Sequence, residues 1–223
     1  MKRYALIVAG GSGSRMGSAL PKQFLEVGGI PILMRTIDAF ANMKDVPEII
    51  LALPENQIDF WRELIEKHNF QTSHTVVKGG ASRFQSVKNG LDKLQGGGLV
   101  AVHDGVRPFT PANVLDEAYK TAEKTGSAVV AVELKDSIRE IDGDGNSEAK
   151  DRAQYRLVQT PQVFGLKNLK DAYAQPEQSR FTDDASVFEA FGGKITLTQG
   201  AYENIKITTP EDMVFAEAFV KSL

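Results

Sequence analysis

Residues 6–22 read LIVAGGSGSRMGSALPK, and we expect the rest of the chain to be organised around this stretch. The apolar run at 4–8 predicts a buried strand at the centre of a sheet. The run stops at 9–14, where glycines let main-chain N–H groups point at one spot without side chains in the way. Exposed amides in succession form an anion-binding concavity, and Arg15 and Lys22 add two cations. The stretch therefore predicts a phosphate-binding loop directly after a strand.

Two common phosphate-binding motifs do not fit this loop. The dinucleotide fingerprint G-x-G-x-x-G fails because Met16 stands where a third glycine must follow Gly11 and Gly13. The Walker A motif fails because the loop contains no Gly-Lys pair. The remaining pattern, G-x-G-x-R-M followed by Pro-Lys, resembles the signature loop of sugar-nucleotide pyrophosphorylases and related nucleotidyltransferases. The alternative interpretation is a glycine turn with two surface cations.

Composition limits the classes of protein to consider. The chain has 223 residues, enough for one large domain or two small ones, with 42% hydrophobic and 25% charged residues as in soluble globular proteins. A net charge of −3 argues against nucleic acid as a partner, because no basic excess exists to displace counterions. The absence of cysteine excludes disulfides, thiolate nucleophiles and cysteine-ligated zinc.

Targeting signals and membrane segments are not expected. The first strand begins within a few residues of Met1, which leaves no room for a signal peptide. No apolar run approaches the ~20 residues that cross a bilayer. We therefore expect a cytoplasmic protein without a membrane partner.

Strand and helix patterns alternate from residue 4 to residue 132. Such alternation predicts an α/β fold, a Rossmann-like three-layer sandwich whose mainly parallel, twisted sheet is covered by helices on both faces. Besides the first strand, strands are expected at 48–53, 72–77, 99–102 and 127–132, and helices within 31–40, 58–65, 87–94 and 111–124.

Ligands of parallel α/β sheets bind beyond the carboxyl ends of the strands. Three loops of this chain follow expected strands, at 9–22, 79–86 and 103–108. All three should open on the same edge of the sheet. We expect the functional site there.

The pattern changes between residues 136 and 158. The segments 137–141 and 154–158 alternate like strands and are joined by a polar tract, which predicts a long hairpin with too few apolar residues for a core of its own. An isolated hairpin is at best marginally stable in water. We therefore expect residues 136–158 to form a projecting β-arm that lies against a second copy of the chain in a homodimer.

The last third of the chain completes the same domain. No internal repeat or linker is visible, so we expect a single domain over residues 1–223. The expected elements are a helix around 166–173, a capped helix from 182–186 to about 192, a strand at 194–198, a segment at 203–208 that delivers Lys206, and an amphipathic helix beginning at Pro210.

A few side chains could carry chemistry. Asp104, at a strand end, could bind Mg²⁺ or substrate hydroxyls, or it could cap a helix or pair with Arg107. His103 is interpreted as a packing or supporting group rather than a base. Thr182 and Asp183 could be solvated or functional, besides capping a helix. No serine has a histidine and aspartate partner at a recognised spacing, so a hydrolase triad has no support.

A series of motifs then carries a family resemblance over essentially the whole chain. AGGSGSRMG, LPKQFLEVGG, VHDGVRPF, DSI, DR, VQTPQVF, TDDAS and NIKITTPED occur in this order. Together they resemble the 2-C-methyl-D-erythritol 4-phosphate cytidylyltransferases of the non-mevalonate isoprenoid pathway. The resemblance implies transfer of CMP from CTP to 2-C-methyl-D-erythritol 4-phosphate, giving 4-diphosphocytidyl-2-C-methyl-D-erythritol and pyrophosphate.

Three alternatives remain beside that function. The family motif is usually H-D-x-A-R-P, and the valine that replaces its alanine at Val106 also occurs in the sister enzyme that makes CDP-ribitol, so ribitol 5-phosphate is the first alternative acceptor. A non-catalytic nucleotide-binding protein is the second alternative. An NAD-dependent oxidoreductase, the third, needs the loop glycine that Met16 replaces.

The resemblance also implies roles for individual residues. The implied catalytic cations around the triphosphate are Arg15, Lys22 and Lys206. The implied nucleotide-binding residues are Ala9, Gly10, Gly80, Ala81 and Ser86 for cytosine and ribose, and the amides of Gly11, Ser12, Gly13 and Ser14 for phosphates. The family has aspartate where this chain has Ala81, so base contacts through that side chain are lost.

For the acceptor, the resemblance implies a site shared between subunits. Its implied residues are Asp104 and Arg107 around the polyol, Thr182 and Thr208 near the sugar phosphate, and Ser137 and Arg152, which reach from the arm into the neighbouring subunit. The implied cofactor is Mg²⁺ or another divalent cation. No general base is needed, because a phosphate monoester with a second pKa near ~6 is already charged at neutral pH. The reaction instead needs cations that hold two anions together.

Overall fold

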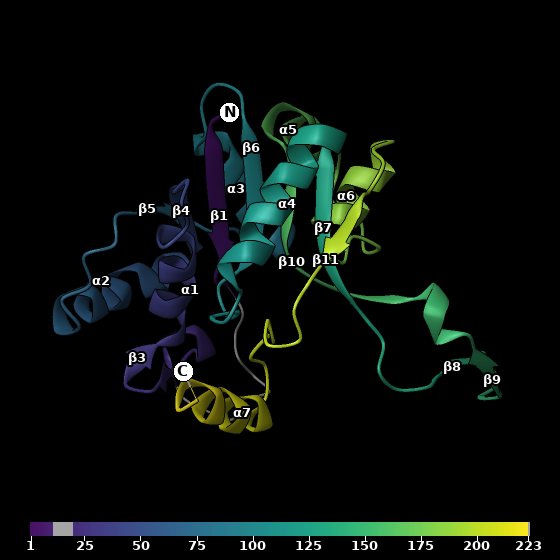
Figure 1. Ribbon diagram of the computed structural model, residues 1–223. Helices are drawn as coiled ribbons and strands as arrows, with labels where there is room; N and C mark the ends of the chain where they lie inside the picture. Colours follow the sequence, from purple (N-terminus) through teal and green to yellow (C-terminus); the bar gives the residue numbers. More distant parts are fainter. Residues whose placement is uncertain (11–19, 223) are drawn as a thin grey trace.

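The computed structural model describes residues 1–10 and 20–222. The strands of its main sheet are β1 (Arg3–Val8), β4 (Glu48–Leu53), β5 (Thr75–Lys78), β6 (Leu99–Asp104), β7 (Ser127–Glu133), β10 (Arg156–Gly165) and β11 (Leu197–Gln199). They lie in the order β11-β7-β10-β6-β1-β4-β5, with β1 inside the sheet (Figure 1). β1 is parallel to β4 and β6, β4 to β5, and β7 to β11, whereas β10 is antiparallel to β6 and β7. The predicted mainly parallel sheet is confirmed.

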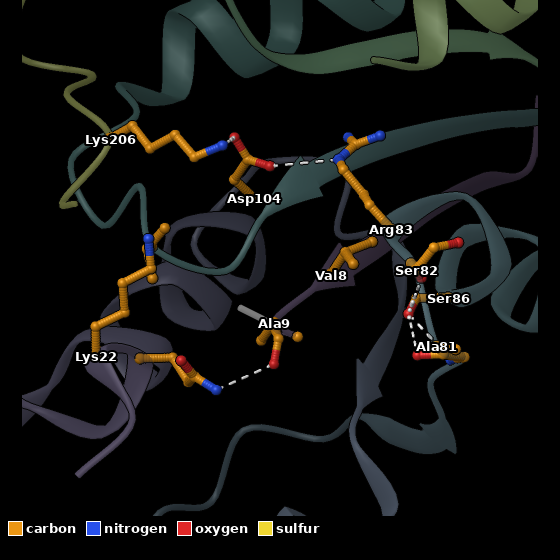
Figure 2. Close-up of a pocket in the computed structure, with 13 residues that line it drawn as sticks. Val8, Ala9, Lys22, Ala81, Ser82, Arg83, Ser86, Asp104 and Lys206 are labelled. Atoms are coloured by element: carbon orange, nitrogen blue, oxygen red, sulfur yellow. Dashed lines mark hydrogen bonds and ion pairs between the residues drawn. The ribbon is translucent and has the colours of Figure 1, made fainter. Parts of the chain in front are cut away.

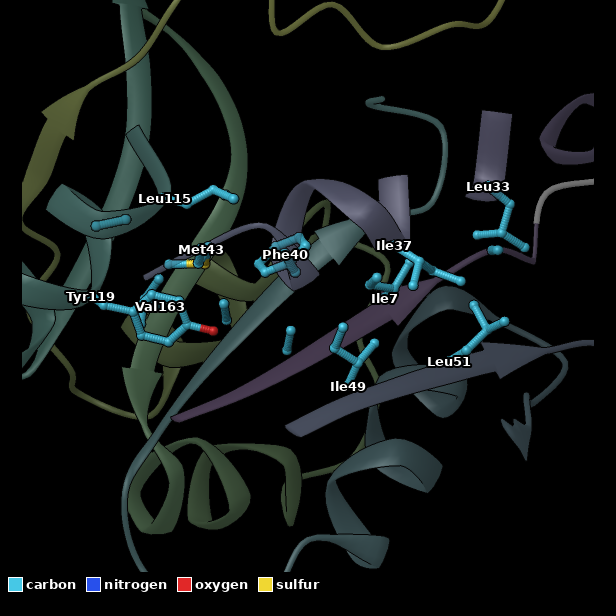
Figure 3. Packing of buried hydrophobic residues seen from close by; sticks show 14 of the residues in the cluster. Ile7, Leu33, Ile37, Phe40, Met43, Ile49, Leu51, Leu115, Tyr119 and Val163 are labelled. Carbon is cyan, nitrogen blue, oxygen red and sulfur yellow. The ribbon is translucent and has the colours of Figure 1, made fainter. Parts of the chain in front are cut away.

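Helices cover both faces of this sheet. One face carries α1 (Ile32–Ala41), α2 (Ile58–Lys67) and α4 (Ala112–Thr125), and the other carries α3 (Arg83–Lys93), α5 (Leu166–Tyr173) and α6 (Asp184–Ala190). Side chains alternate along β1, so Ile7 belongs to the first core layer and Leu6 to the second. Figure 3 shows Ile37 and Phe40 of α1 in the first layer with Ile7. The predicted three-layer sandwich is confirmed.

A smaller unit lies at the end of the molecule that carries the C-terminus (Figure 1). The short strands β2 (Glu26–Val27) and β3 (Ile30–Pro31) form a hairpin against α7 (Pro210–Val220). The closing helix begins at Pro210 as predicted, but it is not amphipathic. Val214 is 73% exposed and Phe215 47% exposed, because the apolar residues of this helix follow one another instead of recurring on one face.

The hairpin predicted at 137–141 and 154–158 has a different second strand. β8 (Ile138–Ile141) pairs with β9 (Ser147–Lys150), and the arm that carries them projects from the sandwich (Figure 1). Residues 156–158 instead belong to β10 and pair with β7 in the main sheet. The prediction was wrong here because the whole of β10 was not recognised as a strand: polar residues interrupt its apolar pattern.

Other element boundaries differ by a few residues. The strand expected at 72–77 is observed as β5, which begins at Thr75, and the strand expected at 194–198 is β11. The prediction for β4 agrees with the structure at both ends. The remaining short elements are the 3₁₀ turns η2 (Lys22–Phe24), η3 (Glu55–Gln57) and η4 (Arg152–Gln154). Over the ranges that the structure describes, every helix is too short or too polar to cross a membrane.

Candidate active site

Two cavities lie where the strands of the sheet end. The larger, about 300 Å³, is bordered by the end of β1, the turn before α3, the end of β6, Lys22 and Lys206 (Figure 2). The smaller, about 200 Å³, is bordered by the end of β6, part of β10 and the start of the segment before α6. Arg83, Asp104 and Lys206 line both cavities. The edge predicted from the strand ends therefore does hold cavities, lined by residues of the three predicted loops and by Lys206.

The end of β1 is packed tightly against the loop after β6. The N–H of Ala9 donates to the carbonyl of Ala52 at 3.0 Å, and the N–H of Gly105 donates to the carbonyl of Val8 at 2.9 Å. A Cβ added at Gly105 would lie 2.7 Å from the Cβ of Ala9. Only glycine permits this approach, so Gly105 brings the β6 loop and its aspartate next to the central strand.

The turn before α3 is folded around one hydroxyl group. The Oγ of Ser86 accepts a hydrogen bond from the N–H of Gly80 at 3.0 Å and donates to the carbonyl of Ser82 at 2.8 Å. Ala81 is exposed beside this turn. The predicted nucleotide-binding residues that the structure describes all line the larger cavity: Ala9, Gly10, Gly80, Ala81 and Ser86.

A buried carboxylate surrounded by cations lies between the two cavities. Asp104 Oδ2 is 3.0 Å from Lys206 Nζ and 3.3 Å from Arg107 Nε, and Oδ1 is 3.8 Å from Arg83 Nε. Burial by itself would raise the pKa of Asp104, but these three cations lower it well below its ordinary value. Asp104 is therefore ionised at neutral pH. Of the two structural roles considered for it, capping a helix or pairing with Arg107, the pair with Arg107 is present.

A neutral histidine is linked to the backbone of Asp104 through the hydroxyl of Thr160. The N–H of Asp104 donates to Thr160 Oγ1 at 3.1 Å, and Thr160 Oγ1 lies 3.1 Å from His103 Nδ1. The other ring nitrogen of His103 lies 3.3 Å from the carbonyl of Arg107, so Nε2–H donates there and Nδ1 accepts from Thr160. Burial lowers the pKa of His103 to about 4. The interpretation of His103 as a supporting group rather than a base agrees with this geometry.

A buried asparagine fixes the segment that carries Lys206. Asn204 is fully buried, and its amide nitrogen donates to the carbonyl of Thr160 at 2.9 Å and to Gln159 Oε1 at 3.2 Å. Its side-chain oxygen accepts from the hydroxyl of Thr110 at 2.8 Å, and its carbonyl accepts from Arg107 Nη1 at 2.8 Å. Asn204 therefore joins the β6 loop, β10 and the Lys206 segment at one point.

Sequence reasoning missed Asn204, Thr160 and Arg83 as contributors to the site. The signals present were the polar interruption of β10 in VQTPQVF and the asparagine two residues before Lys206 in NIKITTPED. Both motifs contributed to the family resemblance, but the hydrogen-bonding roles of their polar side chains were not predicted. Arg83, the first residue of α3, lies in the loop region 79–86 that was expected at the site, but no motif pointed to its side chain.

The other predicted residues are spread over several places. Lys22 lines the larger cavity with Lys206, and Thr182 lines the smaller one with Arg107. Thr208 lies outside the lining of both cavities, and its hydroxyl donates to Asp212 Oδ2 at 2.9 Å in the cap of α7. The predicted loop residues Gly11, Ser12, Gly13, Ser14 and Arg15 lie outside the described residues.

The two predicted arm residues do not reach the site of their own chain. Ser137 and Arg152 are exposed on the arm, where the guanidinium of Arg152 donates to the carbonyl of Lys135. Their contribution to a neighbouring subunit stays a prediction.

The described residues do not form a metal site by themselves. Among residues 1–10 and 20–222, no group of three or more histidine, aspartate or glutamate side chains could hold a metal ion. Asp104 offers a single carboxylate, and both of its oxygens already face cationic groups. This arrangement disfavours Asp104 as the Mg²⁺ ligand, since nearby cations repel a divalent ion.

The fold and the candidate site together define a class of protein. A parallel α/β sheet with cavities at the strand ends, and with cations gathered around one ionised carboxylate, is typical of an enzyme that handles phosphorylated ligands.

The family model for 2-C-methyl-D-erythritol 4-phosphate cytidylyltransferase (IspD) matches residues 4–222, and the chain belongs to this family. The family resemblance read from the motifs is thereby confirmed, and with it the expectation of a cytidylyltransferase enzyme.

Curated relatives and solved structures agree with this assignment. The 2-C-methyl-D-erythritol 4-phosphate cytidylyltransferase of Bacteroides thetaiotaomicron is 50% identical over 220 residues, covering 99% of this chain and 100% of the relative. That of Porphyromonas gingivalis is 48% identical over 222 residues, covering 99% of both chains. The crystal structure of 4-diphosphocytidyl-2C-methyl-D-erythritol synthase from Anaerococcus prevotii superposes with a TM-score of 0.85 at 33% identity, covering 99% of this chain and 96% of that one. The Thermus thermophilus cytidylyltransferase superposes with a TM-score of 0.80 at 31% identity, covering 99% and 100%.

Proposed function

We propose that this protein transfers CMP from CTP to 2-C-methyl-D-erythritol 4-phosphate by in-line attack of the sugar phosphate on the α-phosphorus, with pyrophosphate as the leaving group. The products are 4-diphosphocytidyl-2-C-methyl-D-erythritol and pyrophosphate. The observation that carries the proposal is that Lys206 lines both cavities, so one cation faces the place of the nucleotide and the place of the acceptor.

The chemistry needs no base from the protein. The acceptor phosphate has a second pKa near ~6 and is already an anionic nucleophile at neutral pH. His103, buried and neutral, is therefore not required for proton removal. The barrier comes from bringing two anions together and from charge on the equatorial oxygens, and fixed cations lower both contributions. In this proposal Lys22 and Lys206 act on the nucleotide phosphates, together with Arg15.

The two cavities divide the substrates between them. CTP occupies the larger cavity, where the end of β1 and the turn around Ser86 offer main-chain groups to cytosine and ribose. The acceptor occupies the smaller cavity, beside Asp104, Arg107 and Thr182. Thr208 would have to release its bond to Asp212 before it could contact the sugar phosphate.

The family match favours methylerythritol phosphate over ribitol 5-phosphate as the acceptor. Val106, the residue that departs from the family motif, lines the larger cavity and not the smaller one. The valine at position 106 therefore bears on the cavity that we assign to the nucleotide, and not on the cavity of the acceptor.

A divalent ion such as Mg²⁺ would bind with the triphosphate and neutralise phosphate charge.

The arm supports a homodimer as part of the proposal. Ile141 on the arm, Tyr155 just before β10, and Leu157 and Val158 at the start of β10 are each more than 40% exposed, so large apolar side chains are exposed on the arm and where it meets the sheet. A second copy of the chain would cover them and would bring Ser137 and Arg152 to the partner's acceptor cavity.

We further propose that the enzyme works in the cytoplasm, where nucleoside triphosphates are available.

The test combines a substrate panel with two variants. The protein is incubated with each nucleoside triphosphate, Mg²⁺ and either methylerythritol phosphate or ribitol 5-phosphate, and pyrophosphate release is measured. We expect release with CTP and methylerythritol phosphate, and a fall of about 10²–10³ in kcat for Lys22→Ala and Lys206→Ala. Lys120→Ala, an exposed lysine of α4, is the matched control. Binding of CTP without pyrophosphate release would identify a nucleotide-binding protein, and full activity of both variants would refute the assigned roles.

A further inference from the structure

A row of alternating charges separates the two cavities. Arg83 Nε lies 3.8 Å from Asp104 Oδ1, and Asp104 Oδ2 lies 3.0 Å from Lys206 Nζ. Figure 2 shows the three side chains in this order, each reaching from a different segment of the chain. All three line both cavities. The row therefore lies where the two substrates would meet.

The outer end of this row is anchored in the core. Both Nη atoms of Arg83 donate to the carboxylate of Asp184, at 3.0 Å and 2.6 Å. Asp184 is fully buried, and the hydroxyl of Tyr173 donates to its Oδ1 at 2.6 Å. Tyr173 in turn stacks on Phe84, with ring centroids 4.6 Å apart. These bonds hold the carboxylate of Asp184 in place, so it fixes the plane of the guanidinium.

This anchoring decides which edge of the guanidinium faces the site. A guanidinium presents its N–H groups in a rigid planar fork. With both Nη atoms used by Asp184, the remaining Nε edge of Arg83 faces Asp104 Oδ1. The other carboxylate oxygen, Oδ2, is then left to Lys206 and Arg107. Arg83, held from the core, therefore contributes to the orientation of the Asp104 carboxylate together with Arg107 and Lys206.

The charge balance explains why a second carboxylate is needed. Asp184 neutralises Arg83, so Arg83 orients Asp104 without competing strongly for it. A free guanidinium at this place would attract Asp104 and draw it away from Lys206. The side chain of Lys206 is 43% exposed and has a flexible stem, so the position of its ammonium depends on Asp104 Oδ2.

We propose that Arg83, held by Asp184, is a positioning residue for the transfer reaction: it orients the Asp104 carboxylate and thereby places the Lys206 ammonium between the two substrates. The inference rests on the proposed function and adds a residue that the family motifs did not assign. Its role lies in the transferring step rather than in binding CTP.

Two variants test this role. Arg83→Lys keeps the positive charge beside Asp184 but removes the planar fork, so it cannot hold Asp184 and face Asp104 together. The triple variant Arg83→Met, Asp184→Leu, Tyr173→Phe removes both charges and the hydroxyl that would lose its acceptor. Replacing a buried ion pair by apolar side chains of similar volume commonly preserves folding. Arg62→Lys, on the exposed face of α2, is the control.

The measurements are melting temperature, and kcat and KM for CTP and for methylerythritol phosphate, on the full-length protein. We expect both variants to melt cooperatively, to lose about tenfold or more in kcat, and to keep KM for CTP within about twofold, because misplacement of one group lowers the rate of the transferring step. The control should match the parent protein.

Two kinds of result would overturn the inference, and they are distinguishable. If either folded variant keeps kcat within about twofold of the parent, the Arg83–Asp184 pair is only structural. The same conclusion follows if Arg83→Lys lowers the melting temperature while kcat per folded molecule is unchanged, and this variant decides alone if the triple variant does not fold. If the parent itself shows no turnover, the proposed function fails together with the inference.

Discussion

The carboxyl edge of the sheet and the arm both carry predicted site residues, but they hold them in opposite ways. At the edge, Asp104 is 7% exposed and Asn204 fully buried, and each has several hydrogen-bonding or ionic partners. On the arm, Ser137 and Arg152 are exposed. The edge is built from segments far apart in sequence, whereas the pairs of β8 join residues fewer than fifteen positions away.

The geometry of the candidate site comes from the buried polar network at the edge. At the edge, buried polar groups that lose a partner are costly, so the network has one favourable arrangement. On the arm, Lys150 pairs with Glu140 and Glu148, but both carboxylates are exposed and water screens the pairs. One chain alone therefore fixes the edge, whereas the exposed ion pairs of the arm add little to the definition of its position.

The largest effect should come from breaking the edge at its centre. Asn204→Asp replaces an amide that donates to Thr160 and Gln159 by a carboxylate, which leaves oxygen facing oxygen and adds a negative charge near Asp104. We expect a loss of about 4 kcal/mol in the free energy of unfolding. Urea denaturation followed by circular dichroism measures it.

The same substitution on the arm provides the comparison. Asn146→Asp also removes an amide donor beside a carboxylate, since Asn146 Nδ2 donates to Asp142 Oδ2 at 3.1 Å. Both groups are exposed, so water solvates the two charges and the stability should change far less. Equal losses for the two variants would contradict the contrast between edge and arm.

The same contrast explains what could be predicted from sequence. Strand β4 was predicted at both ends because its apolar run stops at Pro54, which is local information. Strand β10 was predicted only as far as Val158, and the rest was missed because Gln159, Thr160 and Gln162 are polar yet buried. Their hydrogen bonds go to residues more than twenty positions away, so no local pattern signals a strand.

The candidate site also contains residues that local sequence patterns predict and residues that only long-range contacts place. The convergence of Lys22, Asp104 and Lys206 follows from strand ends that share one edge, which the alternation of elements predicts. Arg83 was missed because its partner Asp184 is 101 positions away, and only the folded chain brings them together. The motifs predicted the family, and the fold supplied the supporting contacts of the candidate site.

The free energy of unfolding should depend on pH through His103 at the edge. Burial lowers the pKa of His103 from 6.5 to about 4, so the folded state binds this proton less readily than the unfolded state. The corresponding stability is fully present above pH 6.5 and is lost as the pH falls toward 4. The loss amounts to about 3 kcal/mol. In His103→Gln the slope of unfolding free energy against pH should flatten in this window, as measured by urea denaturation at several pH values.

Other titrating groups do not account for that difference. Burial also lowers the pKa of His74, but this contribution is the same in both proteins and cancels. The three cations lower the pKa of Asp104 well below its ordinary value, so its contribution is lost only at more acidic pH. An unchanged slope in His103→Gln would mean that His103 can take up a proton where it lies, and the edge would then be less rigid than the structure indicates.

The smallest effect is expected on the arm, and it should appear in binding rather than in stability. Arg152→Ala removes an exposed side chain, so the free energy of unfolding should stay near that of the parent protein. If Arg152 reaches the partner's acceptor phosphate, KM for methylerythritol phosphate should rise about tenfold, the loss of one hydrogen bond to a charged group, while KM for CTP is unchanged. Arg139→Ala is the control, because Arg139 bonds to Ser147 within the arm itself. Equal KM values for both variants and the parent, or a protein that sediments as a monomer at micromolar concentration with full activity, would show that the site is complete within one chain.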